Sequence, residues 1–109
     1  MRKKRVTKKL LREITRRIVD RFDPHKIILF GSHARGNADP ESDIDILVIM
    51  PVEGSKREKA VEIGMALNEF SIAKDIFVNT PDQFAWRRKT TGTLEHPADR
   101  EGIILYERS

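Results

Sequence analysis

The chain has 109 residues, of which 35% are charged, and it contains no cysteine. Disulfide frameworks, thiolate zinc sites and cysteine nucleophiles are therefore excluded. Apolar runs fall far short of the roughly 20 residues that a membrane-spanning helix needs, and the basic start is not followed by the apolar core of a signal peptide. We expect a cytoplasmic protein that does not contact a membrane, built as one domain with a frayed basic tail over residues 1–5.

The formal net charge of +4 is unevenly distributed along the chain. Residues 1–21 hold 10 basic and 2 acidic side chains, a balance of +8, whereas the remaining residues carry a balance of −4. Two interpretations follow. The N-terminal segment binds a polyanion, or it is an amphipathic helix whose basic face is solvated.

The first half of the chain predicts a helix, two strands and a single helical turn. Apolar residues at steps of three and four predict an amphipathic helix over residues 7–22, which Asp23-Pro24 ends. A short β-branched run predicts a buried strand over residues 26–30, and residues 32–35 predict one helical turn that Gly36 closes. Residues 37–42 are rich in turn formers and predict a loop. Residues 43–50 predict a central strand, because the run is apolar on both faces after its first positions.

The second half continues the alternation of helices and strands. Ser55 and Thr80 each begin a capping-box pattern, which predicts a helix after Ser55 and another over residues 81–88. Residues 75–79 and 102–106 predict two further strands, with a short helix between them near Pro97. We expect Trp86 to lie in the core at a helix end, with contact to nucleic acid as the alternative. The alternation predicts one α/β domain.

The most informative stretch is a motif in two parts, Gly31-Ser32-His33-Ala34-Arg35-Gly36 and then Ser42-Asp43-Ile44-Asp45. A strand that ends in Gly-Ser and enters a helical turn exposes backbone N–H groups. Together with the Ser32 hydroxyl these groups form a cradle for a phosphate. Gly31 has no Cβ, so the backbone can approach a ligand closely. A plain helix N-cap role for Ser32 would use the same geometry.

The second part of the motif brings two carboxylates together. Asp43 and Asp45 leave the same face of the predicted strand, because one residue separates them. Neighbouring carboxylates repel, and Mg²⁺, which prefers carboxylate and phosphate oxygens, would remove that cost. Two ions usually need a third carboxylate, and Asp75 is the best candidate because it opens the next strand, whereas Glu69 and Asp82 fall on predicted helices. The alternatives are a solvated strand end for the pair and a turn-forming role for Asp75.

These residues carry a family resemblance. Gly31-Ser32-x-Ala34-Arg35-Gly36 followed by Ser42-Asp43-x-Asp45 resembles the signature of the DNA polymerase β-like nucleotidyltransferase superfamily. Within it, the short length and the third aspartate on a strand are similar to the minimal nucleotidyltransferases (MNT proteins). Those are typically encoded beside a HEPN-domain protein in prokaryotic toxin–antitoxin pairs. Ile46 stands where leucine is more usual, a change that keeps the apolar character.

The resemblance implies a fold, a reaction and a partner. The fold would be a single α/β nucleotidyltransferase domain over residues 1–109, with a mixed sheet of about four strands flanked by helices. The ligands would be ATP and two Mg²⁺ ions. The reaction would transfer AMP from ATP to a hydroxyl, most often a tyrosine of the HEPN toxin, which makes the chain the antitoxin of a type VII-like pair.

The resemblance also assigns roles to residues. Gly31 and Ser32 would hold the triphosphate, and Asp43 and Asp45 would bind the metal ions. Asp75 would complete the metal site and act as general base on the acceptor hydroxyl. Arg35 would contact a phosphate or pack the loop, and His33, at a variable position of the motif, would have a surface or packing role.

Other functions remain open at the level of the sequence. The protein could silence its toxin by binding alone, without chemistry. It could instead act on the 3′ hydroxyl of an RNA, which the +8 segment favours, or on a small molecule, for which a partner or a second copy would complete the acceptor pocket.

Overall fold

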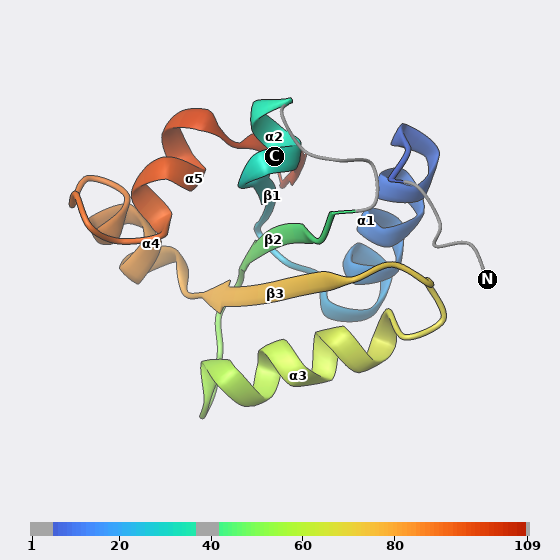
Figure 1. Cartoon of the computed structure of the whole chain (residues 1–109). Helices are drawn as coiled ribbons and strands as arrows, with labels where there is room; N and C mark the ends of the chain where they lie inside the picture. The colour runs from blue at the N-terminus through green and yellow to red at the C-terminus, as the bar shows by residue number, and fades with distance from the viewer. Residues whose placement is uncertain (1–5, 37–41, 109) are drawn as a thin grey trace.

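The sheet that organises the molecule has four strands in the order β3-β2-β1-β4 (Figure 1). The computed structural model describes residues 6–36 and 42–108. The strands are β1 (Lys26–Phe30), β2 (Ile44–Ile49), β3 (Lys74–Asn79) and β4 (Ile103–Glu107). β1 runs antiparallel to both β2 and β4, whereas β2 and β3 are parallel, so the predicted mixed sheet is confirmed.

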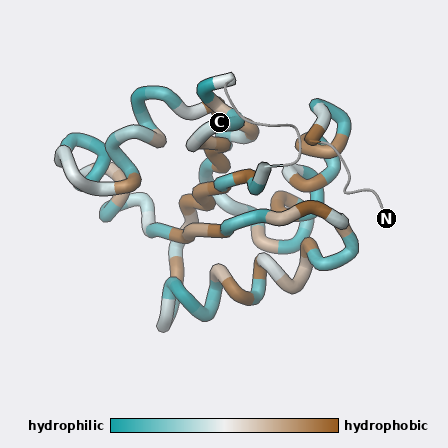
Figure 2. Tube along the Cα trace, in the orientation of Figure 1, coloured by the Kyte–Doolittle hydropathy of each residue, from teal (hydrophilic) through white to brown (hydrophobic). Residues whose placement is uncertain are grey.

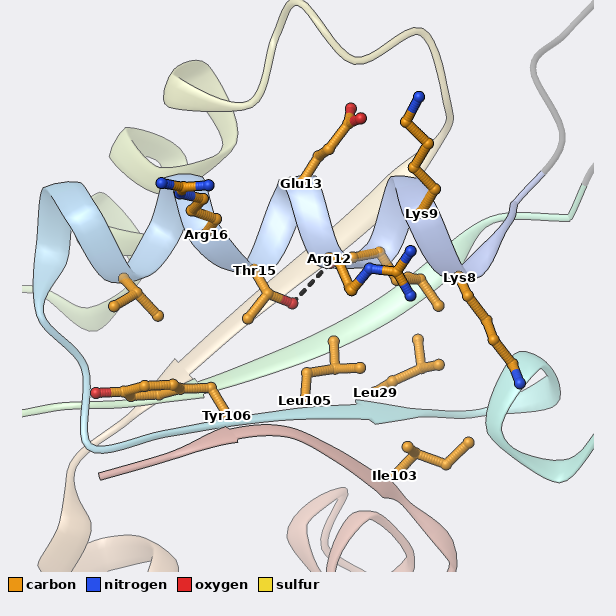
Figure 3. A pocket seen from close by; sticks show the side chains of 12 residues that line it. Lys8, Lys9, Arg12, Glu13, Thr15, Arg16, Leu29, Ile103, Leu105 and Tyr106 are labelled. Carbon is orange, nitrogen blue, oxygen red and sulfur yellow. Dashed lines mark hydrogen bonds between the residues drawn. The ribbon is translucent and has the colours of Figure 1, made fainter. Parts of the chain in front are cut away.

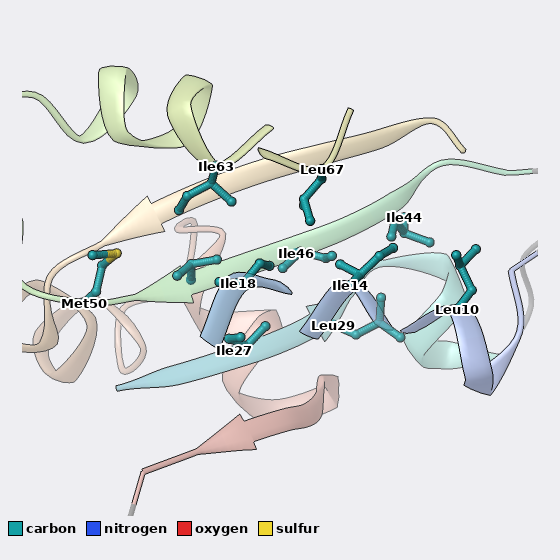
Figure 4. Close-up of a cluster of buried hydrophobic side chains, with 11 residues drawn as sticks. Leu10, Ile14, Ile18, Ile27, Leu29, Ile44, Ile46, Met50, Ile63 and Leu67 are labelled. Atoms are coloured by element: carbon teal, nitrogen blue, oxygen red, sulfur yellow. The ribbon is translucent and has the colours of Figure 1, made fainter. Parts of the chain in front are cut away.

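Helices cover both faces of this sheet. They are α1 (Lys8–Phe22), α2 (Ser32–Arg35), α3 (Lys56–Ala66), α4 (Pro81–Arg87) and α5 (Glu95–Glu101). One face packs against α1 and α3 through a cluster of aliphatic side chains, and Figure 4 shows them converging between the layers. The other face packs against α4 and α5 through a smaller cluster. Figure 2 shows hydrophobic residues along the strands and hydrophilic residues over much of the outer surface of the helices.

The helix starts follow from local signals in the sequence. Thr7 caps α1, since its hydroxyl accepts a hydrogen bond from the Leu10 N–H at 3.1 Å. The Ser55 hydroxyl accepts from the Glu58 N–H at 3.1 Å, and Thr80 caps α4 in the same way. Asp23 ends α1 in the left-handed conformation, with φ of 47°. The predicted starts of these helices are therefore confirmed to within a residue or two, whereas α3 ends at Ala66, earlier than predicted.

The amphipathic reading of the first helix is also confirmed. Leu10, Ile14 and Ile18 of α1 are buried against the sheet, which leaves most of the basic residues of this helix on its outer side. Among the described residues, no helix is long and apolar enough to cross a membrane. The predictions for the tail over residues 1–5 and for most of the loop over residues 37–42 fall outside the described residues.

The prediction that Trp86 lies in the core is wrong. The Trp86 side chain is 65% exposed, and Phe84 fills the core position of α4 at 6% exposure. Two residues along a helix turn by about 200°, so Phe84 and Trp86 cannot both face the sheet. The basic residues next to Trp86 form ion pairs elsewhere, since Arg87 pairs with Glu95 and Arg88 with Asp99.

Candidate active site

Three strand ends meet where the two parts of the motif come together. In the parallel β2–β3 pair, Asp45 stands opposite Asp75, and in the antiparallel β1–β2 pair it stands opposite Phe30. Opposed residues in a sheet share a face, so the Asp45 and Asp75 carboxylates lie side by side. Asp43 is exposed and precedes β2, which begins at Ile44 rather than at Asp43 as predicted. The structure therefore brings the three aspartates to one end of the sheet.

Gly31 makes the closest approach to these carboxylates. Its φ of 76° and ψ of −155° lie in a region that is essentially reserved for glycine. A Cβ placed on Gly31 would overlap the Asp45 Oδ2 atom. Glycine is therefore required at this position for two reasons, the backbone turn from β1 into α2 and the space beside the Asp45 carboxylate.

The Ser32 side of the motif forms the predicted helical turn. Ala34 and Arg35 donate their N–H groups to the Gly31 carbonyl oxygen at 3.1 and 3.2 Å, which closes α2. Gly36 ends it in the left-handed conformation, as predicted. The first N–H groups of a helix have no partner within it, so those of Ser32 and His33, next to the Asp45 carboxylate, are the polar groups that a phosphate would use.

The surroundings of Asp45 change the pKa of its carboxyl group. Burial raises the pKa of Asp45, and the negative charges of Asp75 and Asp43 and a hydrogen bond with Asp75 raise it further. The positive charge of His33 opposes this rise in the pKa. The Phe30 and Phe77 rings, 5.6 Å apart between centroids, lie on the same face of the sheet and contribute an apolar surround. The site therefore holds more negative charge than its own neighbours neutralise.

This charge is what a divalent cation would match. The donors are carboxylate oxygens only, which suits Mg²⁺, and the repulsion that raises the pKa of Asp45 would be relieved by a cation. In the described part of the chain, however, no three His, Asp or Glu side chains are grouped closely enough to surround an ion. The donor set therefore fits the ion in chemistry, whereas the described side chains are not arranged around a common ion position.

Two contacts that position the site were not predicted from the sequence. The His33 Nε2 atom hydrogen-bonds with the Ser42 carbonyl oxygen at 2.9 Å, which links α2 to the residue before Asp43. The Lys74 ammonium donates to the carbonyl oxygens of Phe70 and Ile72, at 3.1 and 3.0 Å, and so fixes the turn that leads into Asp75. The first contact joins residues nine positions apart, and the second is local to the turn before β3; the spacing of residue types indicates neither of them.

Three charged residues that were considered for the site do not join the aspartates. Two of them form ion pairs with other residues and one lies on another element; they are Arg35, Glu69 and Asp82. The Arg35 guanidinium lies 3.8 Å from the Glu101 carboxylate of α5, in a partly exposed ion pair. Glu69 pairs with Arg17 of α1. Asp82 lies in the first turn of α4, which follows the C-terminal end of β3, whereas Asp75 lies at the N-terminal end of that strand. Neither of these two acids joins the three aspartates, as predicted, but Glu69 lies in the turn that follows α3 and not on a helix as predicted.

The fold and this motif define a class of protein. Residues 10–99 match the model of the nucleotidyltransferase domain, so the chain belongs to the nucleotidyltransferase family and is a nucleotidyltransferase enzyme. The resemblance recognised in the sequence is confirmed at this level.

Two proteins are similar in sequence to this chain over most of its length. Two proteins of Methanocaldococcus jannaschii, both named "Putative protein adenylyltransferase", are 34% and 40% identical to this chain. The first match covers 68% of this chain and 72% of the relative, and the second covers 74% and 77%.

Solved structures share the fold at lower identity. A protein of Sulfolobus solfataricus described as a "putative nucleotidyltransferase" superposes with a TM-score of 0.63 at 23% identity, over 92% of this chain and 79% of the other. A chain of the MntA-HepT toxin–antitoxin complex gives 0.56 at 20% identity, over 94% and 74%. A toxin–antitoxin structure with AMP-PNP also gives 0.56, at 22% identity, over 91% and 74%.

Proposed function

We propose that this nucleotidyltransferase transfers AMP from ATP to a tyrosine hydroxyl of a HEPN-domain toxin and acts as the antitoxin of that toxin. The observation that carries the proposal is the contact between the two parts of the motif. Gly31 leaves room for the Asp45 carboxylate, and Asp75 stands opposite Asp45 on the neighbouring strand. A phosphate cradle and a set of carboxylates thus share one end of the sheet.

The reaction requires a nucleophile, an electrophile and a leaving group. The acceptor oxygen would attack the α-phosphorus of ATP, the bond to the β-phosphate would break, and pyrophosphate would leave. Asp75 would accept the proton of the acceptor hydroxyl, because it is exposed at the strand end. Gly31 and Ser32 would hold the triphosphate, because the Ser32 N–H and hydroxyl would donate to a phosphate and Gly31, which has no Cβ, would let it approach. Arg35, whose guanidinium lies in a partly exposed ion pair with Glu101, would contact a phosphate or pack the loop.

Metal ions would complete this chemistry. Asp43, Asp45 and Asp75 would hold two Mg²⁺ ions, which in such sites neutralise the charge that develops on the phosphate oxygens. The pKa of Asp45 is raised first by burial and then by the negative charges of Asp75 and Asp43, and a cation would favour its charged form. The proposed site therefore depends on a cation for its full set of charged carboxylates.

The relatives support the choice of a protein acceptor. Both Methanocaldococcus jannaschii proteins carry the name of protein adenylyltransferases. The toxin–antitoxin complexes contain a chain with this fold, and one of them was solved with AMP-PNP. These comparisons favour a protein hydroxyl over a small molecule.

The proposal is tested with ATP labelled at either the α- or the γ-phosphate, Mg²⁺, and the HEPN protein encoded by the adjacent gene. We expect label from the α-phosphate on a tyrosine of the HEPN protein and none from the γ-phosphate. The D43N/D45N double variant should label nothing, whereas Asp82→Asn, which changes a carboxylate outside the site, should behave as wild type. Label from the γ-phosphate, or equal labelling by the double variant, would refute the proposal.

An RNA acceptor is the second candidate, and the exposed Trp86 side chain is the observation that favours it. An exposed aromatic ring next to basic residues can stack on a base. The ion pairs of Arg87 and Arg88 with Glu95 and Asp99 weaken this alternative, because they already occupy two of the neighbouring cations. Adding an RNA oligonucleotide to the same assay distinguishes the two acceptors.

A further inference from the structure

A wide apolar hollow lies between α1 and β4, on the face of the sheet opposite the aspartates. This α1–β4 groove has a volume of about 930 Å³. Figure 3 shows α1 on one side of it and the side chains of β1 and β4 on the other. Its apolar surface is formed by Leu11, Val19, Leu29, Ile103, Leu105 and Tyr106.

An irregularity in β4 creates the apolar floor. Tyr106 pairs with Ile27 and Ile104 pairs with Ile28, so Leu105 is one extra residue in the ladder. Such a bulge shifts the alternation of side chains. As a result Leu105 and Tyr106 both pack toward the cluster beneath α1, and Ile103, opposite Leu29, faces the same way. β4 thereby presents three apolar side chains to the groove and leaves Ile103 47% exposed.

The rim of the groove is strongly basic. Lys8, Lys9, Arg12 and Arg16 line it along α1, against a single acid, Glu13. Arg16 has an exposed partner in Asp20 at 3.9 Å. No described carboxylate lies within ion-pair distance of Lys8, Lys9 or Arg12. Cations gathered beside an apolar floor are matched by an occupant that carries carboxylates beside an apolar stripe.

The layer geometry indicates the shape of that occupant. On this face of the sheet α3 packs against β3 and lies beside α1 (Figure 1). Helices pack about 8–10 Å apart and strands about 4.8 Å apart, so one helix covers roughly two strands. Two helices therefore leave the fourth strand, β4 at the edge of the sheet, partly uncovered. A third helix beside α1 would complete the layer.

We propose that the α1–β4 groove is the docking site for an amphipathic helix of a partner protein, with acidic residues flanking the apolar stripe of that helix. A second copy of this chain is a poor occupant, because a symmetric contact through the groove would place the basic rim against itself. RNA would match the cations but not the mostly aliphatic floor. That this partner is also the acceptor of AMP rests on the proposed function. The proposal that the groove binds an acidic amphipathic helix does not.

The test uses the full chain and two designed 18-residue peptides. Both carry leucines at helical spacing, flanked in one peptide by glutamates and in the other by lysines. Amide shifts in NMR spectra of the labelled chain locate each peptide, and fluorescence anisotropy measures its affinity. Since neither ATP nor Mg²⁺ is present, failure here and failure of the transfer reaction are separate results.

We expect the glutamate peptide to shift the amides of α1 and β4, with an affinity that decreases as salt is added. Arg12→Glu and Ile103→Glu should each weaken its binding at least about tenfold, since each puts a carboxylate against the peptide. The controls Arg57→Glu and Val61→Glu make the same changes at exposed positions of α3 and should leave the affinity unchanged.

Four results would overturn the proposal. They are the absence of peptide binding, equal binding of the lysine peptide, stronger shifts of the same amides by a single-stranded RNA 15-mer, and a dimer of the chain alone in sedimentation that Ile103→Glu abolishes. The last result would assign the groove to a second copy.

Discussion

Replacement of Gly31 by alanine is the substitution for which the structure makes the sharpest prediction. The new Cβ would overlap the Asp45 Oδ2 atom, so the Asp45 carboxylate must turn away. The backbone of residue 31 would also be strained, because its φ of 76° and ψ of −155° suit only glycine. Such strain costs about 1–3 kcal/mol of the free energy of unfolding.

Gly36→Ala provides a matched control at the other end of α2. Gly36 has the same φ of 76°, with ψ of 11°, and a Cβ there would meet no atom of the described residues within 4 Å. A left-handed alanine costs about 1–2 kcal/mol. Both variants should therefore lose stability to a similar extent, by roughly 4–8 °C in Tm for each kcal/mol in a domain of this size.

The two variants should differ in catalysis. A displacement of about 1 Å at a reacting group can lower the rate about 100-fold, so Gly31→Ala should lose at least that much AMP transfer at a temperature where it is folded. Gly36→Ala should keep most of the wild-type rate. Urea unfolding and the labelled-ATP assay measure the two quantities. Equal transfer rates for the two variants would refute the idea that Gly31 is needed for the space beside Asp45.

Three further substitutions test other parts of the structure. Asp45→Asn should stabilise the ligand-free protein at pH 7 and abolish transfer. The pKa of Asp45 is raised in the fold, so ionisation of Asp45 destabilises the folded state as pH rises from below 3.8 through the folded pKa. In acid Asp45 is protonated, and the thermal melts of the wild type and Asp45→Asn should therefore converge. Glu95→Ala should cost about 2–3 kcal/mol in urea unfolding, because the buried Glu95 carboxylate accepts hydrogen bonds from Asn79 at 2.7 Å and Arg87 at 3.0 Å. Burial alone would raise the pKa of Glu95, but these hydrogen bonds outweigh it and lower that pKa, so this contribution should be lost as pH falls below 4.5. Trp86→Ala should change the free energy of unfolding by less than about 0.5 kcal/mol, since the side chain is exposed, and a larger loss would contradict its placement.

Local signals in the sequence were sufficient for most of the fold. The hydroxyls of Thr7, Ser55 and Thr80 cap their own helices, so each helix start is encoded within four residues. Gly36 closes its helical turn in the same local manner. These elements could be predicted because both partners of each interaction lie close together in the chain.

Features that depend on tertiary contacts could not be predicted in this way. Phe84 and Trp86 are both large and apolar, and only the packing of α4 on the sheet decides which of them is buried. The bulge at Leu105 has no signature in the sequence, yet it determines the floor of the α1–β4 groove. The burial of Glu95 likewise requires Asn79 from a different element.

The candidate site combines both kinds of information. The motif gave Gly31 and the aspartates Asp43 and Asp45, because their spacing is local. The position of Asp75 depends on the parallel pairing of β2 with β3, which places it opposite Asp45. The contact of His33 with Ser42 was not predicted, because it links two segments through the loop between them.

The most direct test of the central claim is the rate at which α-phosphate label passes from ATP to the HEPN protein, with Mg²⁺ present, for the wild type and Asp45→Asn. We expect transfer by the wild type with release of one pyrophosphate for each AMP attached, and a loss of at least about 1000-fold in the variant, from removal of a charge at the reacting centre. If the variant is folded by its thermal melt and still transfers AMP at the wild-type rate, Asp45 has no role in the reaction and the proposed function is refuted.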